Sequence, residues 1–241
     1  MKTLKLISSL VILSIFFQSC QKGGPWGIMG KGDNITETKD IGEFDRVHLS
    51  IDADVFYTQD SVYKVEVSAQ SNILAVLSTE VKSGVLTFDF KRNVWDHEKI
   101  KITVHSPRIN EINISGSGNV TTQNAITTND LELSISGSGS VYIASLNAVS
   151  LKADISGSGD VTIYSGSLIS QNLSLSGFGK IDAENIMAKI CTADISGSGD
   201  ITVNVSDNLN ATISGSGNIS YKGNPTLEVD ISGSGKLVKI N

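Results

Sequence analysis

The stretch Ile114-Ser-Gly-Ser-Gly118 is the first copy of the repeat that decides the fold. The pattern Ile/Leu-Ser-Gly-X-Gly occurs seven times, and its copies begin at Ile114, Ile135, Ile155, Leu175, Ile195, Ile213 and Ile231. Successive copies begin 21, 20, 20, 20, 18 and 18 residues apart. A repeat of this length is typical of proteins in which each structural unit packs only on its neighbours.

Apolar residues surround each copy at alternate positions. Two residues before the Ile or Leu stand Ile112, Leu133, Ala153, Leu173, Ala193, Ala211 and Val229. Six residues after it stand Val120, Val141, Val161, Ile181, Ile201, Ile219 and Leu237. Polar residues such as Ser134 and Asp154 lie between them, so the pattern predicts two short strands with one buried face each. The glycines between the strands permit a tight corner.

These elements predict an all-β protein, a right-handed single-stranded parallel β-helix (solenoid) with coils of 18–21 residues. A propeller is disfavoured because one blade of four strands needs about 40 residues. A β-sandwich would not require identical corner residues. The right-handed sense is favoured over the left-handed hexapeptide type because a strict six-residue apolar rhythm is missing.

The solenoid is expected to occupy residues 41–241 as one domain. Residues 109–241 form its regular coils, whereas residues 41–108 alternate in the same way but lack the Ser-Gly corner. We therefore expect irregular first coils and a cap over 41–108, with a short capped helix starting at Ser71 and Asn72. At the other end, the lysines of the segment 236–241 are expected to discourage end-to-end strand pairing.

The first twenty residues have the pattern of an export signal. Two lysines precede an apolar run from Leu6 to Phe17, and Ser19 and Cys20 follow it. The run is shorter than the about 20 residues that span a membrane. This stretch resembles a bacterial lipoprotein signal, which implies a signal peptide over 1–19 and a lipid on Cys20. The lipid would attach the protein to the outer membrane, on its periplasmic side or on its surface side. The alternative is an ordinary cleaved signal with an incidental cysteine.

Residues 20–40 are Gly-rich at their start and aperiodic, which predicts a flexible tether between the lipid and the fold. The formal net charge of the whole chain is −6, and removal of Lys2 and Lys5 with the signal makes the chain more acidic. Nucleic acid is therefore not an expected partner. Two cysteines exclude a disulfide scaffold and a zinc cluster with several Cys ligands.

No residue pattern predicts a catalytic, cofactor or metal site. His48, His97 and His105 are not spaced as ligands of one ion, although a Ser-His-Asp site assembled in space stays open. The residue after each repeat is Asn119, Ser140, Asp160, Lys180, Asp200, Asn218 or Lys236. A lysine between two aspartates argues against a row of bound calcium ions. Cys191 falls in an apolar column and is expected to be a small buried residue.

Two aromatic residues are candidates for surface contact. Phe178 replaces the serine found at the centre of the other six repeats, and Trp95 lies in the polar run 91–97. Exposed aromatic side chains often anchor interfaces. Both could instead pack against an adjacent turn.

Several segments together resemble a known bacterial family. They are Phe44-Asp-Arg-Val47, the run Glu80-Val-Lys-Ser-Gly-Val-Leu-Thr87, and the strand that follows Pro107 into the first repeat. The family is "putative auto-transporter adhesin, head GIN domain", a domain of secreted or lipid-anchored proteins, and the resemblance covers about residues 38–241. It implies a β-helical fold and no catalytic residues.

The expected function is that of a lipid-anchored cell-envelope binding protein, an adhesin that contacts a glycan or a protein with its elongated surface. One alternative is a polysaccharide-active β-helix enzyme, which would need two carboxylates, or a carboxylate with Arg or Lys, in one groove. The other is a structural component of envelope assembly without a ligand, which would form a homo-oligomer through a solenoid face.

Overall fold

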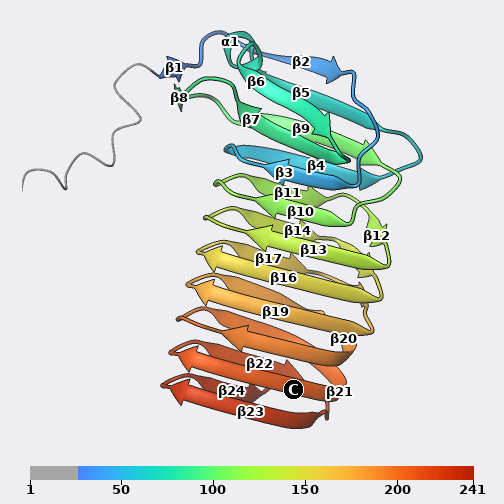
Figure 1. Ribbon diagram of the computed structural model, residues 1–241, viewed down its shortest axis with the longest axis vertical. Helices are drawn as coiled ribbons and strands as arrows, with labels where there is room; N and C mark the ends of the chain where they lie inside the picture. Colours follow the sequence, from blue (N-terminus) through green and yellow to red (C-terminus); the bar gives the residue numbers. More distant parts are fainter. Residues whose placement is uncertain (1–26) are drawn as a thin grey trace, which may run out of the picture.

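A stack of parallel coils, closed by a cap at its N-terminal end, makes up the protein (Figure 1). The structure is a computed structural model, and it describes residues 27–241. The predicted signal peptide 1–19 and the lipidation site Cys20 lie outside the described residues. The all-β solenoid predicted from the repeats is confirmed, whereas its right-handed sense stays a prediction.

Each regular coil contributes one strand to each of two long parallel sheets. The first sheet contains the strands that precede the Gly corners: β10 (Glu111–Ile114), β13 (Asp130–Ile135), β16 (Ser150–Gly157), β19 (Ser170–Gly177), the later parts of β20 (Lys180–Ile195) and β21 (Asp200–Gly215), and β23 (Thr226–Gly233). The second contains β11 (Asn119–Thr122), β14 (Ser140–Ile143), β17 (Asp160–Ile163), the first parts of β20 and β21, β22 (Asn218–Lys222) and β24 (Lys236–Lys239). Three short strands complete the early coils: β12 (Ala125–Thr127), β15 (Ser145–Asn147) and β18 (Gly166–Ser167).

The seven repeats lie directly over one another. Ile114 pairs with Ile135, Ile135 with Ile155, and the same register continues to Ile231. Like residues therefore stack on like residues at the ~4.8 Å spacing of neighbouring strands, and the coils satisfy each other's backbone N–H and C=O groups. The predicted apolar columns are buried from the first regular coil to the one that ends in Ile213.

The corner glycines are required by the close approach of successive coils. A Cβ atom on Gly159 would overlap the carbonyl oxygen of Gly139 in the preceding coil and would lie 2.7 Å from Cγ2 of Ile135. The earlier glycine of the same repeat, Gly157, has a φ of +147°, which side-chain-bearing residues rarely adopt. The repeat is therefore conserved along the stack for reasons of packing and backbone geometry.

The N-terminal cap is built from antiparallel strands as well as parallel ones. The first coil consists of β3 (Arg46–Leu49) and β4 (Ala53–Gln59), which pair in parallel with β10 and β11 on one side and with β7 (Val85–Phe90) and β9 (Ile100–Ser106) on the other. Antiparallel pairing then adds β6 (Leu77–Lys82) to β7, and β5 (Lys64–Gln70) to β9. The chain thus builds the cap above its first coil before it returns below that coil to begin β10.

Two local predictions in this region are wrong. Residues 27–39 belong to the cap and not to a flexible tether: β1 (Ile28–Met29) pairs with β8 (Val94–Asp96), and β2 (Asn34–Lys39) pairs with β5. The physical reason is that the outer edge of β5 has unpaired backbone groups, which β2 satisfies. The short helix α1 (Ser71–Leu74) exists, but Gln70 precedes it and no side chain caps its first turn.

The last coil leaves its inward side chains exposed. Leu227, Val229 and Ile231 of β23 continue the buried columns of the preceding coils, yet each is exposed because no further strand of the described chain covers it. Lys239 occupies the position below Tyr221, and its ammonium group donates a hydrogen bond to Asn224 (2.7 Å). A charged side chain at an inward position of an edge strand agrees with the predicted role of lysine there.

Candidate functional site: a polar groove where the cap meets the solenoid

A groove of about 890 Å³ lies where the cap joins the regular coils. The segment from Pro107 to Asn110 forms one wall, and the turn 127–129 with the first residues of β13 and β16 forms the other. Arg108, Asn110, Asn129, Asp130, Glu132 and Lys152 are among the lining residues. The groove is therefore lined by polar and charged side chains from consecutive coils.

Gln59 holds the two walls together at the floor of the groove. Its side-chain amide donates hydrogen bonds to the carbonyl oxygens of Pro107 (2.9 Å) and Thr127 (3.0 Å), and its side-chain oxygen accepts one from the backbone N–H of Thr127 (2.7 Å). Asn124 pairs in the same way with the backbone N–H and C=O of Gln59 (2.9 and 2.8 Å). An additional strand beside β12 would satisfy these backbone groups with its own backbone. Here the side-chain amides of Gln59 and Asn124 satisfy them instead.

Several polar side chains of the groove are already bonded to each other. Thr128 donates to the side-chain oxygen of Asn110 (2.9 Å), and Ser150 donates to Asp130 (2.5 Å). Lys152 forms ion pairs with Glu132 (2.7 Å) and Asp154 (3.0 Å), and the hydrogen bond that its ammonium group donates to Glu132 is the main cause that raises the pKa of Lys152. These contacts fix the orientation of the wall before any ligand binds.

Arg108 and Asn129 are exposed side chains of the groove. The Arg108 side chain is 65% exposed, and its only ion pair within residues 27–241 joins its Nε to Asp45 over 3.7 Å. Asn129 is exposed, and its backbone oxygen, not its side chain, accepts hydrogen bonds from Val149 and Ser150. A guanidinium donor beside an amide and two carboxylates can bond to hydroxyl or carboxylate groups of a ligand.

The sequence pattern does not predict this groove, and the two aromatic residues proposed for surface contact, Phe178 and Trp95, do not line it. Phe178 is 76% exposed in the row of corner residues, between the equivalent positions Ser158 and Ser198. Trp95 is 67% exposed on β8 in the cap. Both are therefore surface residues, and their roles in contact stay predictions. The groove was missed because four separate segments form it, with no common motif.

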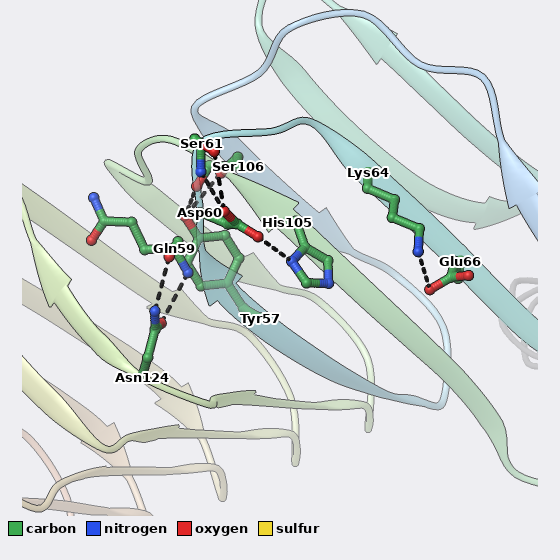
Figure 2. Close-up of polar contacts among 9 residues, drawn as sticks. All are labelled: Tyr57, Gln59, Asp60, Ser61, Lys64, Glu66, His105, Ser106 and Asn124. Atoms are coloured by element: carbon green, nitrogen blue, oxygen red, sulfur yellow. Dashed lines mark hydrogen bonds and ion pairs between the residues drawn. The ribbon is translucent and has the colours of Figure 1, made fainter.

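The best approximation to a catalytic triad in the described residues lacks a nucleophile. His105 Nδ1 lies 3.3 Å from Asp60 Oδ2, and Figure 2 shows the imidazole directed at this carboxylate. The hydroxyl of Ser106 is buried and bonded to Tyr57 Oη (2.8 Å) and to the carbonyl oxygen of Arg108 (2.7 Å). The hydroxyl of Ser61 bonds to Asp60 (3.3 Å), not to the histidine. Burial raises the pKa of Tyr57 to about 12.

The other histidines are also separate. His48 Nε2 lies 2.8 Å from Glu111 Oε1 across the first sheet, and His97 bonds to the carbonyl oxygen of Glu98. Within residues 27–241, no three His, Cys, Asp or Glu side chains gather in a way that could hold a metal ion. No helix in that part of the chain is long and apolar enough to cross a membrane.

The structure is a capped β-solenoid with a polar groove on its side, and the comparisons with known proteins place it in a family. A family model described as "Putative auto-transporter adhesin, head GIN domain" matches residues 43–225, and the chain belongs to this family. The resemblance stated from the sequence is thus confirmed. No curated protein matches the chain.

Solved structures of similar fold come from Bacteroides and Parabacteroides species. A structure described as a putative adhesin from Bacteroides fragilis is 32% identical, with a TM-score of 0.84 over 89% of this chain and 100% of that one. A putative adhesin from Parabacteroides merdae is 23% identical, with a TM-score of 0.73 over 89% and 99%, and shows a similar fold. A "putative lipid binding protein" from Parabacteroides distasonis is 25% identical, with a TM-score of 0.71 over 90% and 100%.

Proposed function

We propose that this protein is a lipid-anchored adhesin of the cell envelope, and that the groove between the cap and the solenoid binds a glycan. Family membership supports the adhesin class. The observation that carries the choice of contact surface is the groove itself, whose walls present the Arg108 guanidinium, the Asn129 amide and the carboxylates of Asp130 and Glu132 together. Membrane attachment through Cys20 rests on the signal pattern alone.

A glycan suits this groove better than a protein. Protein interfaces usually depend on a central cluster of buried aromatic or aliphatic side chains. The groove lining contains no aromatic residue. Its only aliphatic residues are Pro107 and Leu131, and Leu131 is buried. Hydroxyl groups of a glycan, in contrast, both donate and accept hydrogen bonds and so match a wall of amides, carboxylates and cationic groups.

The groove also gives a specific reason to test for a polysaccharide-active enzyme. Asp130 and Glu132 lie two residues apart on β13 and share one face of that strand, with Arg108 and Lys152 in the same groove. We favour binding over catalysis because Lys152 and Ser150 already engage the two carboxylates. Release of new reducing ends or unsaturated sugars by the wild-type protein, lost in Asp130→Asn and Glu132→Gln, would replace the adhesin proposal.

A role in envelope assembly has support from the last coil. The side chains of Leu227, Val229 and Ile231 form an exposed aliphatic surface beside unpaired backbone groups of β23. Such a surface favours association with another strand edge. Light scattering of the purified protein across a concentration series tests this role, and a monomer at the highest concentration would exclude self-association through this end.

A glycan array with the full-length chain tests the proposed binding function. We expect the double variant Arg108→Ala/Asn129→Ala to lower the affinity for at least one array glycan at least tenfold, because both side chains are exposed in the groove. The matched control is Asn172→Ala, an exposed residue of β19 outside the groove, which should bind as the wild type does. Equal binding by all three proteins would contradict the assignment of the groove.

Labelling with radioactive palmitate in the producing bacterium tests the lipid anchor. Wild-type protein should incorporate the label and fractionate with membranes, whereas Cys20→Ser should lose both properties. An unlabelled wild-type protein would show that the export signal is of the ordinary cleaved type.

A further inference from the structure

Three aromatic residues gather on the outward face of the second sheet, on a different surface from the groove. The strand register places Phe56, Thr121, Tyr142 and Thr162 in one column across β4, β11, β14 and β17. Neighbouring strands are ~4.8 Å apart, so Phe56 and Tyr142 are about 10 Å apart along the solenoid axis, with Thr121 between them. Tyr164 follows Thr162 by two residues, lies just beyond the end of β17 and continues its outward alternation.

Among residues 27–241, these rings have no aromatic or hydrogen-bonding partner that explains them. Tyr164 is 57% exposed, and Phe56 and Tyr142 are half-buried. Within residues 27–241, ring pairs form between Phe44 and Tyr63 and between Phe90 and His97, and neither involves this column. Neither phenol oxygen of Tyr142 and Tyr164 is hydrogen-bonded to the described part of the protein. Tyrosine at an exposed site offers both a flat apolar surface and a polar end to a ligand.

The surroundings of the column carry little unpaired charge. The strand residues before it are Asn119 and Ser140, which are neutral, and Asp54 and Asp160, whose carboxylates are occupied. Charged residues also adjoin the column: Lys101 pairs in register with Asp54, and Asp182, which follows Thr162 in the column, forms an ion pair with Lys180 (2.8 Å). Asp54 accepts a hydrogen bond from the Asn119 side chain (3.1 Å) and pairs with Lys99 (3.4 Å). Asp160 accepts a hydrogen bond from the backbone N–H of Lys180 (2.9 Å). The face therefore suits an uncharged ligand better than an ionic one.

A glycan of extended shape matches this arrangement. Sugar rings present C–H groups on their flat faces, which pack on aromatic rings, and hydroxyl groups at their edges, which can bond to Thr121, Thr162 and the phenols. Successive rings of an extended β-1,4-linked chain recur at a spacing close to that of the strands. Alternate sugar rings of a chain lying along the solenoid axis would consequently meet Phe56 and Tyr142.

We propose that the column formed by Phe56, Thr121, Tyr142 and Thr162, together with Tyr164, binds an uncharged, extended β-1,4-linked glycan that lies along the solenoid axis. This inference rests on the proposed glycan-binding function and adds a second contact surface to it. The groove supplies charged and amide groups at one place, whereas this column supplies a track that crosses several coils. The two surfaces are distinguishable by substitution.

Titration calorimetry of the full-length chain tests the column with defined probes. The probes are β-1,4-linked hexaoses of glucose and of N-acetylglucosamine, and the control is the α-1,4-linked hexaose of glucose, whose chain coils. We expect at least one β-linked hexaose to bind and the α-linked hexaose to bind at least tenfold more weakly. The corresponding disaccharide should also bind at least tenfold more weakly, because it cannot reach both Phe56 and Tyr142.

Tyr142→Ala and Tyr164→Ala should each weaken binding of the β-linked hexaose at least threefold, whereas Tyr142→Phe should keep most of it. Asn172→Ala, an exposed residue on the outward face of the first sheet, is the matched control. Tyr164→Ala remains informative if Tyr142→Ala fails to fold, because Tyr164 is largely exposed. Absence of binding by both β-linked hexaoses, or unchanged binding by folded alanine variants, would overturn the proposal.

The groove variant Arg108→Ala/Asn129→Ala separates this inference from the proposed function. If the column binds the hexaose, this variant should keep the wild-type affinity. Loss of hexaose binding in the groove variant, with normal binding in Tyr164→Ala, would overturn the column proposal and leave the groove as the glycan site. A lower melting temperature of Tyr142→Ala with unchanged affinity would assign that ring to sheet packing alone.

Discussion

Gln171 pairs in register with Cys191 of the next coil, and both side chains lie inside the solenoid. The same inward column contains Leu151 and Leu209, so the glutamine occupies a place otherwise taken by apolar residues. Neither the amide nitrogen nor the amide oxygen of Gln171 has a hydrogen-bond partner of ordinary geometry in the described structure, although its contact with the Cys191 thiol opposes the rise in the pKa of that thiol. A buried amide without partners costs about 1–3 kcal/mol.

Replacement of this amide by an apolar side chain of similar volume should stabilise the protein. Gln171→Leu continues the column of Leu151, and we expect the free energy of unfolding to rise by about 1–3 kcal/mol. The midpoint of thermal unfolding should rise by about 2–4 °C per kcal/mol. Leu151→Gln is the reverse control and should destabilise by a similar amount. A lower melting temperature for Gln171→Leu would show that the amide has partners, such as buried water.

Cys191 should make stability fall in alkaline solution. Burial raises the pKa of its thiol from 9.0 to about 12, so the folded state holds the proton that the unfolded state loses above about pH 9. The neutral thiol's contribution to the free energy of unfolding is fully present below pH 9. It is lost progressively as the pH rises to about 12. Denaturant titrations at pH 8 and pH 10.5 should show a smaller drop for Cys191→Ala than for the wild type. Equal drops would contradict the burial of the thiol.

The corner glycines should be far less tolerant of substitution than the serines beside them. Gly159→Ala places a methyl group against the Gly139 carbonyl oxygen, which belongs to the backbone and cannot move aside easily. We expect the free energy of unfolding to fall by about 3 kcal/mol, which is the upper end of the usual cost of adding volume to a packed site. Ser158→Ala, an exposed neighbour in the same corner, should change stability by less than about 0.5 kcal/mol. Similar values for both variants would argue against the close stacking of the corners.

The amide contacts of Gln59 should connect the cap to the first regular coil. Gln59→Ala removes its side-chain hydrogen bonds to Pro107 and Thr127. We expect the free energy of unfolding to fall by only about 1–2 kcal/mol, because the site is partly exposed to water. Hydrogen exchange of the Thr127 backbone N–H should accelerate in this variant. Asn124→Ala breaks the neighbouring bonds to the Gln59 backbone, and the double variant measures whether the two amides act together. Unchanged exchange at Thr127 would contradict the role of Gln59.

The sequence predicted the regular coils well because one physical requirement recurs in each of them. Ile114 and its counterparts must fill the interior, and Gly118 and its counterparts must let one backbone pass close to the next. Both requirements leave a residue-level pattern at a fixed spacing. Even Gln171, a polar residue in an otherwise apolar column, occupies the buried position that its column indicates.

The cap and the groove could be predicted only in outline, since their contacts are not periodic. The alternation of residues 64–70 indicates a strand but not its antiparallel partners, and nothing in residues 34–39 signals that they complete the edge of β5. The groove depends on how Arg108 and Asn129, from a loop and a turn, come to lie beside β13. Tyr142 and Tyr164 lie on one outward face because of the coil register, which becomes clear only when the strands are aligned.

The affinity of the groove variant for a glycan tests the central claim most directly. Full-length wild-type protein, Arg108→Ala/Asn129→Ala and Asn172→Ala should be compared on one array, after circular dichroism has established that all three are folded. Our account predicts at least a tenfold loss for the groove variant alone. Undiminished binding of every array glycan by that variant, or no glycan binding by the wild type, would contradict it.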